Sequence, residues 1–224
     1  MTGANSGAQE AGSGQTPGMS DPLHAAAPRP DFLTKPVLDG DLVTLRVVTA
    51  ADIPALRPLW EEPECRRLTG SHPLPPEESA EVAEAKVAAW YTTRAGQDDR
   101  LDLAVVDRAG GLVVGEVVLN EWSPGNESCS FRIALVAAGR NRGLGTEATR
   151  LICGYGFEKL GLHRISLEVY AFNPRARRAY EKAGFVVEGV LRDALLWEGR
   201  WVDSTAMSIL AAEWERHRGH PGTG

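Results

Sequence analysis

Hydrophobic and polar residues alternate along several short segments of the chain, and this period of two predicts β-strands. In the first segment, Leu42–Val48, apolar residues occupy every second position from Val43 to Val47. Six further segments have the same strand character: Leu101–Val106, Leu112–Trp122, Cys129–Val136, Ile165–Tyr170, Phe185–Leu191 and Trp201–Leu210. Together they predict a sheet of about seven strands.

Two helices are expected between the first and second of these strands. Thr49 and Asp52 form a variant of the capping box, which starts a helix toward Trp60. Pro54 and Pro58 must keep that helix short or irregular, because proline lacks the amide hydrogen that a helix interior needs. A second helix is expected from residue 76 to about residue 94, and its core-facing residues are predicted to be Val82, Val87 and Trp90.

A glycine turn at residues 140–145 leads directly into a third helix, in which apolar residues recur at helical spacing from Ala148 to Tyr155. Two glycines leave the backbone amides of residues 142–146 uncovered, and uncovered amides at a helix N-terminus bind phosphate. Taken alone, such a turn could equally serve only to bend the backbone. The residues predicted to hold a pyrophosphate are Arg140, Asn141, Arg142, Gly143, Leu144, Gly145 and Thr146.

The segment that follows favours the phosphate site over a simple bend. Ile165–Tyr170 alternates like a strand, and Asn173 with the proline after it opens a short helix that carries Tyr180 and ends at Gly184. With these motifs the chain resembles the GNAT family of N-acetyltransferases. The family's phosphate loop, R/Q-x-x-G-x-G/A, is similar to residues 140–145. Its later signature, E-V-x-x-x-N followed by A-x-x-x-Y-x-x-x-G-F, is similar to residues 168–185.

Within that family the chain looks most like the ribosomal-protein acetyltransferases, which acetylate protein N-termini. The resemblance covers roughly residues 38–212 and implies an α+β fold with a mixed, mostly antiparallel sheet and helices on both faces. It implies acetyl-CoA as the acetyl donor and direct attack by the acceptor amine, with no acyl-enzyme. It also implies that the strand end near Leu135 pairs through its backbone with the pantetheine arm.

The resemblance assigns catalytic roles to two residues. Tyr180 matches the general acid that protonates the departing thiolate, although a tyrosine here could instead only pack on Phe185. Glu168 matches the general base of the N-terminal acetyltransferases; its plain alternative is a carboxylate on a strand surface, and Glu116 or a water molecule competes for the role. Asn173 is expected to contact the pantetheine arm or to order water there, and its structural alternative is a helix N-cap.

The acceptor remains open at this point. A protein or peptide N-terminus, a polyamine, an antibiotic amine and a free amino acid are all primary amines that such an enzyme acetylates. Three carboxylates, Glu61, Glu62 and Glu64, either border the acceptor groove or belong to a solvated loop. A larger donor such as succinyl-CoA, and a non-catalytic module that only binds acyl-CoA, are the alternatives to acetyl transfer.

Composition narrows the remaining choices. The chain has 224 residues, a net charge of −6 and a pI near 5.4, which argues against a general nucleic-acid binder. We expect a disordered tail over residues 1–30, one domain over 38–212 and a polar tail over 213–224. With no long apolar run, no secretory signal and three cysteines outside any framework, a cytoplasmic location without membrane contact is expected. No metal site is expected, Cys153 is expected to be a small buried hydrophobe, and a homodimer is a possible assembly.

Overall fold

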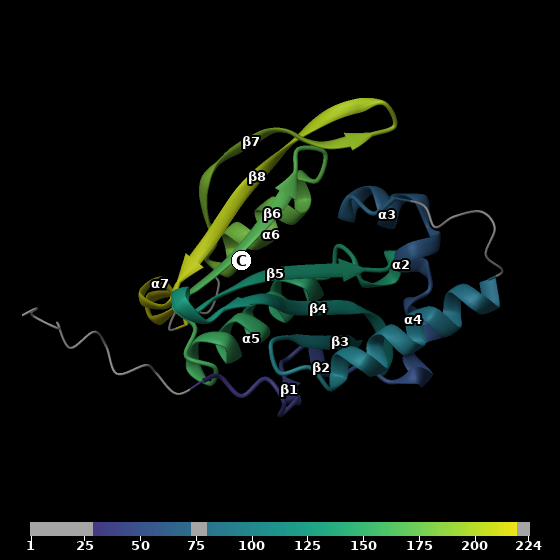
Figure 1. The fold of residues 1–224 in the computed structure, drawn as a ribbon, viewed down its shortest axis with the longest axis horizontal. Coiled ribbons are helices and arrows are strands. Elements are labelled where there is room, and N and C mark those ends of the chain that lie inside the picture. The colour runs from purple at the N-terminus through teal and green to yellow at the C-terminus, as the bar shows by residue number, and fades with distance from the viewer. Residues whose placement is uncertain (1–28, 73–79, 219–224) are drawn as a thin grey trace, which may run out of the picture.

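The computed structural model describes residues 29–72 and 80–218, and its centre is a sheet of eight strands (Figure 1). The strand order is β1-β2-β3-β4-β5-β6-β8-β7, and every neighbouring pair is antiparallel except β5 and β6. The strands are β1 Leu38–Asp39, β2 Val43–Val47, β3 Leu101–Asp107, β4 Leu112–Ser123, β5 Ser128–Leu135, β6 Arg164–Tyr170, β7 Val186–Trp197 and β8 Arg200–Leu210. The expected α+β class and mixed sheet are confirmed. The eighth strand, β1, spans only two residues, which is too short for an alternation to be seen.

Helices cover both faces of the sheet. Figure 1 shows α4 and α5 on opposite sides of it, and the face that carries Leu119 packs on α5. The helices are α1 Ile53–Leu56, α2 Pro58–Glu61, α3 Pro63–Thr69, α4 Ala80–Ala95, α5 Leu144–Glu158, α6 Pro174–Ala183 and α7 Ala211–His217. No helix in the described part of the chain combines the length and apolar character needed to cross a bilayer.

The first predicted helix is broken, as its prolines require. It appears as the short helices α1 and α2, and Pro58 begins the second of them. The capping pair at its start is formed: Asp52 Oδ2 accepts hydrogen bonds from the Thr49 amide at 2.8 Å and from the Thr49 hydroxyl at 2.9 Å.

The inward face predicted for α4 is wrong in part. Val82 and Trp90 are 47% and 40% exposed, whereas Tyr91 is 6% exposed and turns toward the sheet. Val87, four residues before Tyr91, packs against the core as predicted, so the helix is rotated by about one residue from the expected phase. Trp90 lies at the rim, where the Arg94 guanidinium covers its ring at 3.6 Å from the centroid.

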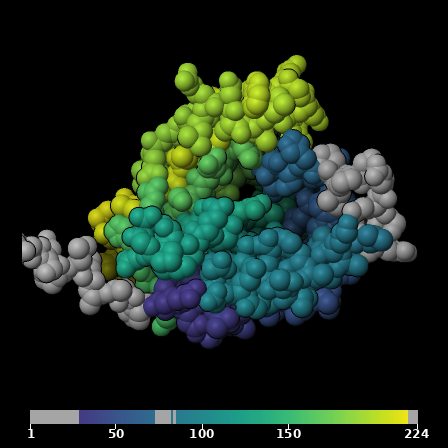
Figure 2. Space-filling model, viewed as in Figure 1, coloured from purple at the N-terminus to yellow at the C-terminus, as the bar shows by residue number. Residues whose placement is uncertain are grey.

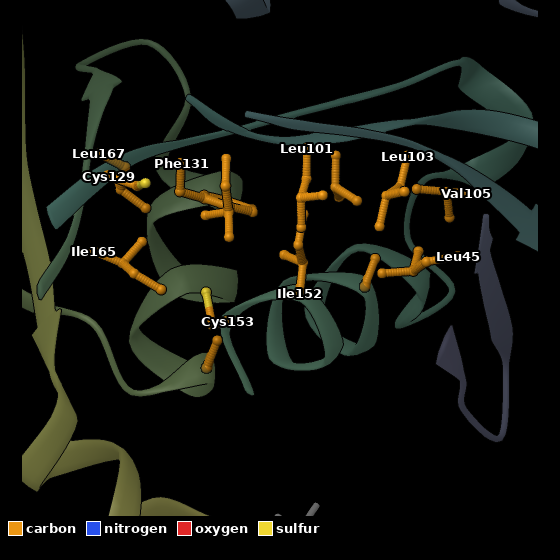
Figure 3. Close-up of a cluster of buried hydrophobic side chains, with 14 of the residues drawn as sticks. Leu45, Leu101, Leu103, Val105, Cys129, Phe131, Ile152, Cys153, Ile165 and Leu167 are labelled. Carbon is orange, nitrogen blue, oxygen red and sulfur yellow. The ribbon is translucent and has the colours of Figure 1, made fainter. Parts of the chain in front are cut away.

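The core between the sheet and α5 follows the apolar spacing of that helix. Ile152 and Cys153 point from α5 toward Phe131 and Ile165 of the sheet (Figure 3). Cys153 is fully buried, and burial raises the pKa of its thiol. This is the small buried hydrophobe that its position on the helix predicted.

The C-terminal boundary differs from the expected one. Residues 211–217 form α7, so the polar tail expected from residue 213 begins inside a helix. Trp214 anchors that helix: its ring stacks on Phe157 at 6.0 Å and its indole nitrogen donates to Glu158 at 2.9 Å. A single aromatic residue was too weak a pattern to predict this docking. Apart from residues 29 and 30, the expected N-terminal tail lies outside the described residues, as do residues 219–224.

One irregularity of the sheet positions the functional site. The parallel strands β5 and β6 pair over only three positions, the last of which joins Ser130 to Ser166. Beyond it β5 stays paired with β4, and β6 stays paired with β8. Residues 131–135 and 167–170 therefore diverge and leave two free strand edges that face a gap.

Candidate active site

A cavity of about 940 Å³ lies where β5 and β6 diverge. Figure 2 shows the surface hollowed between α3 and these strands. Among the predicted site residues, those that line the cavity are Glu116, Leu135, Arg140, Asn141, Gly143, Gly145, Thr146, Glu168, Asn173 and Tyr180. Arg142 and Leu144 do not line it. Residues up to 64 positions apart in sequence therefore meet around one gap in the sheet.

The loop before α5 has the geometry of an anion-binding nest. Asn141 and Gly143 adopt left-handed backbone conformations, with φ of 60° and 80°, and α5 begins at Leu144. The Glu147 amide, which donates to the Gly143 carbonyl at 3.1 Å, makes the first hydrogen bond of the helical ladder. The amides just before it are the uncovered donors of a helix N-terminus and can bind phosphate oxygens.

The two arginines of this loop, both predicted to help hold a pyrophosphate, turn away from the nest. Arg140 turns toward α3 and β5: its Nε donates to the Leu135 carbonyl at 2.9 Å and its Nη2 to Cys65 Sγ at 2.7 Å. Arg142 forms an ion pair with Asp107 at 2.6 Å. Both guanidinium groups are therefore held by other parts of the chain.

Three cations missing from the sequence-based prediction line the cavity from α6 instead. They are Arg175, Arg178 and Lys182. Arg175 donates to Asn141 Oδ1 at 3.1 Å, which places its charge beside the nest. Their spacing of three and four residues puts them on one face of the helix, and that spacing is the signal that could have identified them.

Tyr180 enters the cavity from the α6 side. Its ring is buried, 8% exposed, and meets Phe131 edge to face at 6.0 Å. Burial raises the pKa of the phenol, so the hydroxyl stays protonated through neutral pH. Within the described residues it makes no hydrogen bond. The ring also lies 6.0 Å from Phe185, the packing that the structural alternative expected, and the hydroxyl is available as a proton donor.

Glu168 enters from the opposite face of the sheet. Its neighbours Leu167 and Val169 are buried on the α5–α6 side, whereas Glu168 is exposed. Its Oε2 accepts a hydrogen bond from the Ser204 hydroxyl at 2.9 Å. The carboxylate and the Tyr180 hydroxyl thus approach one gap from two sides.

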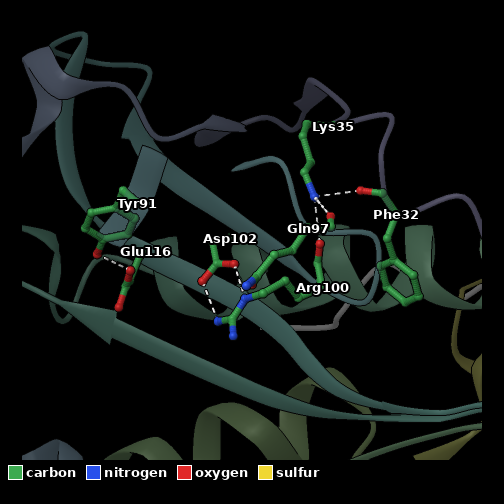
Figure 4. Close-up of polar contacts among 7 residues, drawn as sticks. All are labelled: Phe32, Lys35, Tyr91, Gln97, Arg100, Asp102 and Glu116. Carbon is green, nitrogen blue, oxygen red and sulfur yellow. Dashed lines mark hydrogen bonds and ion pairs between the residues drawn. The ribbon is translucent and has the colours of Figure 1, made fainter. Parts of the chain in front are cut away.

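Glu116, the competing base, is held differently. It accepts a hydrogen bond from the Tyr91 hydroxyl of α4, as Figure 4 shows. Burial raises the pKa of its carboxyl group, which favours the protonated form. One oxygen of Glu116 is thus already occupied by the Tyr91 hydroxyl, whereas the hydrogen bond that Glu168 accepts comes from Ser204 at the edge of the gap, and we favour Glu168 over Glu116 as the base.

Asn173 has the structural role that was its alternative. Its Oδ1 accepts from the Ala176 amide at 3.1 Å and caps α6. Its Nδ2 donates to the Leu68 carbonyl at 3.4 Å, so the residue also ties α6 to α3 across the cavity. Because it lines the cavity, contact with the donor stays a prediction.

The carboxylates expected near the acceptor groove are engaged elsewhere. Glu61 lies 3.8 Å from Arg57, and Glu64 lies 3.2 Å from Arg140. Glu62 accepts the Cys65 thiol hydrogen at 3.3 Å. None of the three carboxylates lines the cavity, although α3 borders it through Cys65 and its neighbours.

The sequence of residues 43–186 matches the family model described as an acetyltransferase (GNAT) domain. The chain belongs to the GNAT acetyltransferases. It is 32% identical over 121 residues to the probable N-acetyltransferase YjcK of Bacillus subtilis, covering 54% of this chain and 67% of that protein. It is 33% identical over 110 residues to spermidine N(1)-acetyltransferase of Vibrio cholerae, covering 49% of this chain and 64% of that enzyme.

A solved structure supports the same assignment. The spermidine N-acetyltransferase of Vibrio cholerae, crystallised with CoA and spermine, superposes with a TM-score of 0.70 at 26% identity. The match covers 79% of this chain and 99% of that GNAT chain. The expected fold, the enzymatic activity and acetyl-CoA as the donor are confirmed: the chain is an N-acetyltransferase that transfers an acetyl group to an amine.

Proposed function

We propose that this GNAT enzyme acetylates a primary amine, either the α-amino group of a peptide or the amine of a small molecule. In this proposal Glu168 is the general base and Tyr180 the general acid. The observation that carries the proposal is the placement of these two side chains on opposite faces of one gap in the sheet. Donor and acceptor can then enter from different sides and meet between β5 and β6.

On the donor side, the nest at residues 143–146 receives the pyrophosphate, and Arg175 adds positive charge beside it. The free edge of β5 supplies backbone groups for the pantetheine arm. At Leu135 the carbonyl is already bonded to Arg140, so pairing at that residue requires the guanidinium to move.

In the chemical step, the neutral amine attacks the thioester carbonyl and forms a tetrahedral intermediate. Glu168 takes the proton from the nitrogen, directly or through a water molecule, and the C–S bond breaks as Tyr180 donates its proton to the sulfur. For unperturbed groups, a thiol near ~8.5 and a phenol near ~10 differ by about 1.5 pKa units, or roughly 2 kcal/mol, and the burial that raises the pKa of Tyr180 widens this gap. A hydrogen bond from the Tyr180 hydroxyl to the departing sulfur has to offset that difference.

Two classes of acceptor are candidates for this enzyme. One is a protein N-terminus, supported by the motif resemblance and by 30% identity over 105 residues to the putative ribosomal N-acetyltransferase YdaF of Bacillus subtilis, covering 47% of this chain and 57% of that protein. The second is a polyamine, supported by the similarity to spermidine acetyltransferases. Glu61, Glu62 and Glu64, the carboxylates expected to steer a polycation, do not line the cavity and are engaged by other groups, and on this ground we favour the α-amine.

Release of CoA thiol from acetyl-CoA, measured over a panel of peptides, spermidine and amino acids, tests this assignment. The wild-type enzyme should turn over peptides. Glu168→Gln should lose turnover by at least about ten-fold while binding acetyl-CoA normally. The matched control is Glu181→Gln, on the outer face of α6. Acetyl-CoA binding without release for any amine would instead support a non-catalytic module, and release only with succinyl-CoA would replace the donor.

The homodimer and the cytoplasmic location also stay proposals. The edge strand β7 and the hairpin tip expose apolar side chains, among them Val190 at 58% and Trp201 at 61%, and Figure 1 shows this hairpin standing out from the body. Such a surface suits a second copy of the chain. The buried free thiols Cys65, Cys129 and Cys153 are consistent with a reducing compartment. Light scattering after size exclusion, on wild type and Trp201→Ser, tests the dimer.

A further inference from the structure

Arg132 is an arginine in the cavity that the catalytic scheme does not use. It lies on β5 between Ser130 and Ala134, exposed and lining the cavity. Within residues 29–72 and 80–218 it forms no hydrogen bond or ion pair. By contrast, Arg140 and Arg164 in the same cavity are bonded to carboxylates, to Glu64 and Glu188 respectively.

The strand register places Arg132 opposite Glu168. Ser130 and Ser166 form the last pair of the parallel strands, and each charged residue lies two positions further along its own strand. Side chains two positions apart on a strand lie on the same face of the sheet. The Arg132 and Glu168 side chains therefore lie on one face, on either side of the gap. Both charges act on the Tyr170 hydroxyl nearby: beyond the larger effect of burial, Glu168 raises its pKa and Arg132 lowers it.

A carboxyl group on the neighbouring strand lies near Arg132 but is engaged by another residue. Glu116 is opposite Ala134, one diagonal step from Arg132. It accepts a hydrogen bond from the Tyr91 hydroxyl and forms no ion pair with Arg132. Glu121, another carboxylate that lines the cavity, accepts a hydrogen bond from the Ser130 hydroxyl at 2.6 Å. Arg132 and Glu168 therefore flank the gap without an ion pair between them in the described residues.

We propose that Arg132 determines acceptor specificity by binding an anionic group of the acceptor, so that the preferred substrate is an α-amine with a carboxylate close by in the same molecule. This inference rests on the proposed function, in which the amine lies at Glu168. Guanidinium binds carboxylate in a bidentate manner. The same charge repels a polyamine, because two unit charges about 4 Å apart interact by roughly 1 kcal/mol in water and about 4 kcal/mol near a protein surface.

Peptides with one acetylatable amine test the proposal. Three C-terminally amidated peptides that begin with alanine would carry aspartate, alanine or arginine at the second position, and free alanine would be added as the amino-acid arm. For wild type, kcat/KM should be about ten-fold higher with aspartate than with alanine at the second position. Arg132→Gln should bring that ratio close to one with little change on the neutral peptide. Arg132→Glu should reverse the preference toward arginine.

The control is Arg177→Gln, which changes the net charge equally on the outer face of α6, where Arg177 pairs with Glu181. It should keep the wild-type preference. An unchanged preference in Arg132→Gln, with neutral peptides still acetylated, would overturn the Arg132 assignment and leave the proposed function standing. Absence of CoA release with every peptide would overturn both. A preference for free alanine over all peptides, lost in Arg132→Gln, would identify the carboxylate as that of an amino acid.

Discussion

The two sides of the cavity present different kinds of chemical group. On the proposed donor side, the groups offered to the ligand belong mainly to the backbone: uncovered amides at the start of α5 and the free edge of β5. On the proposed acceptor side, single side chains such as Glu168 and Arg132 lie on one face of the sheet. Backbone geometry depends on glycines and helix ends, so it tolerates few sequence changes. Side chains can be exchanged without disturbing the fold, and acceptor choice can therefore vary while the donor stays the same.

The largest change in turnover is expected at Tyr180, which lies between the donor side and the acceptor side. Tyr180→Phe keeps the ring and its contact with Phe131 but removes the proton donor. Turnover should fall by roughly 100-fold, the scale of lost acid catalysis, while acetyl-CoA affinity stays unchanged. Steady-state kinetics and calorimetry on the same preparation check both halves. Turnover equal to wild type would reduce Tyr180 to a packing residue.

The next effect should appear only on the donor side. Gly143→Val introduces a β-branched side chain at a φ of 80° and crowds the nest, so acetyl-CoA affinity should fall about ten-fold or more. Gly161→Val is the matched control, because Gly161 has a φ of 67° and no atom within 4 Å of an added Cβ, yet lies outside the cavity. Calorimetric affinity that is the same for both variants would contradict the phosphate site.

The smallest effect concerns the hairpin that supports the acceptor side. Arg164 holds the pKa of Glu188 down to about 2, below the ~4.3 of an unfolded glutamate. A lowered folded pKa gives stability above pH ~4.3 that is lost as the pH falls toward 2. Because both side chains are partly exposed, the loss should stay under about 1 kcal/mol. Urea unfolding should show that the free energy of unfolding of wild type exceeds that of Glu188→Gln at pH 7, and that this excess is smaller at pH 3. An equal difference at both pH values would contradict the linkage.

What could be predicted from the sequence follows the same division. The strands, the nest and the helix with Tyr180 depend on local spacing, and six strands, α5 and α6 were predicted close to their observed bounds, whereas β7 runs to Trp197, six residues beyond its predicted end. The partners of side chains could not be predicted, because they depend on pairing between distant segments. Arg140 meets Cys65 across 75 positions, and Arg142 meets Asp107 across 35. No local pattern indicates such contacts, and the same holds for Arg132 beside the gap.

The buried face of a helix was a second feature that the sequence predicted only in part. In α4, Val82, Val87 and Trp90 suggested one inward face, yet Tyr91 is the buried residue because its hydroxyl has a partner in Glu116. A tyrosine is as amphipathic as a tryptophan, so composition alone could not choose between the neighbours. The alternation in β6 was easier to interpret, because Leu167 and Val169 bracket Glu168 and fix its face.

Acetylation of an α-amine in preference to a lysine side chain is the central claim, and magnitudes favour it. A lysine ammonium near pKa ~10.4 gives its proton to a carboxylate near ~4.3 across about 6 units, roughly 8 kcal/mol. For an α-amino group with a pKa near ~8, the difference from the carboxylate is under about 4 pKa units, or roughly 5 kcal/mol. The direct measurement is mass spectrometry of a peptide with one free N-terminus and one lysine after incubation with enzyme and acetyl-CoA. We predict acetylation mapped to the N-terminal amine; acetylation confined to the lysine would contradict the account and favour a polyamine-like acceptor.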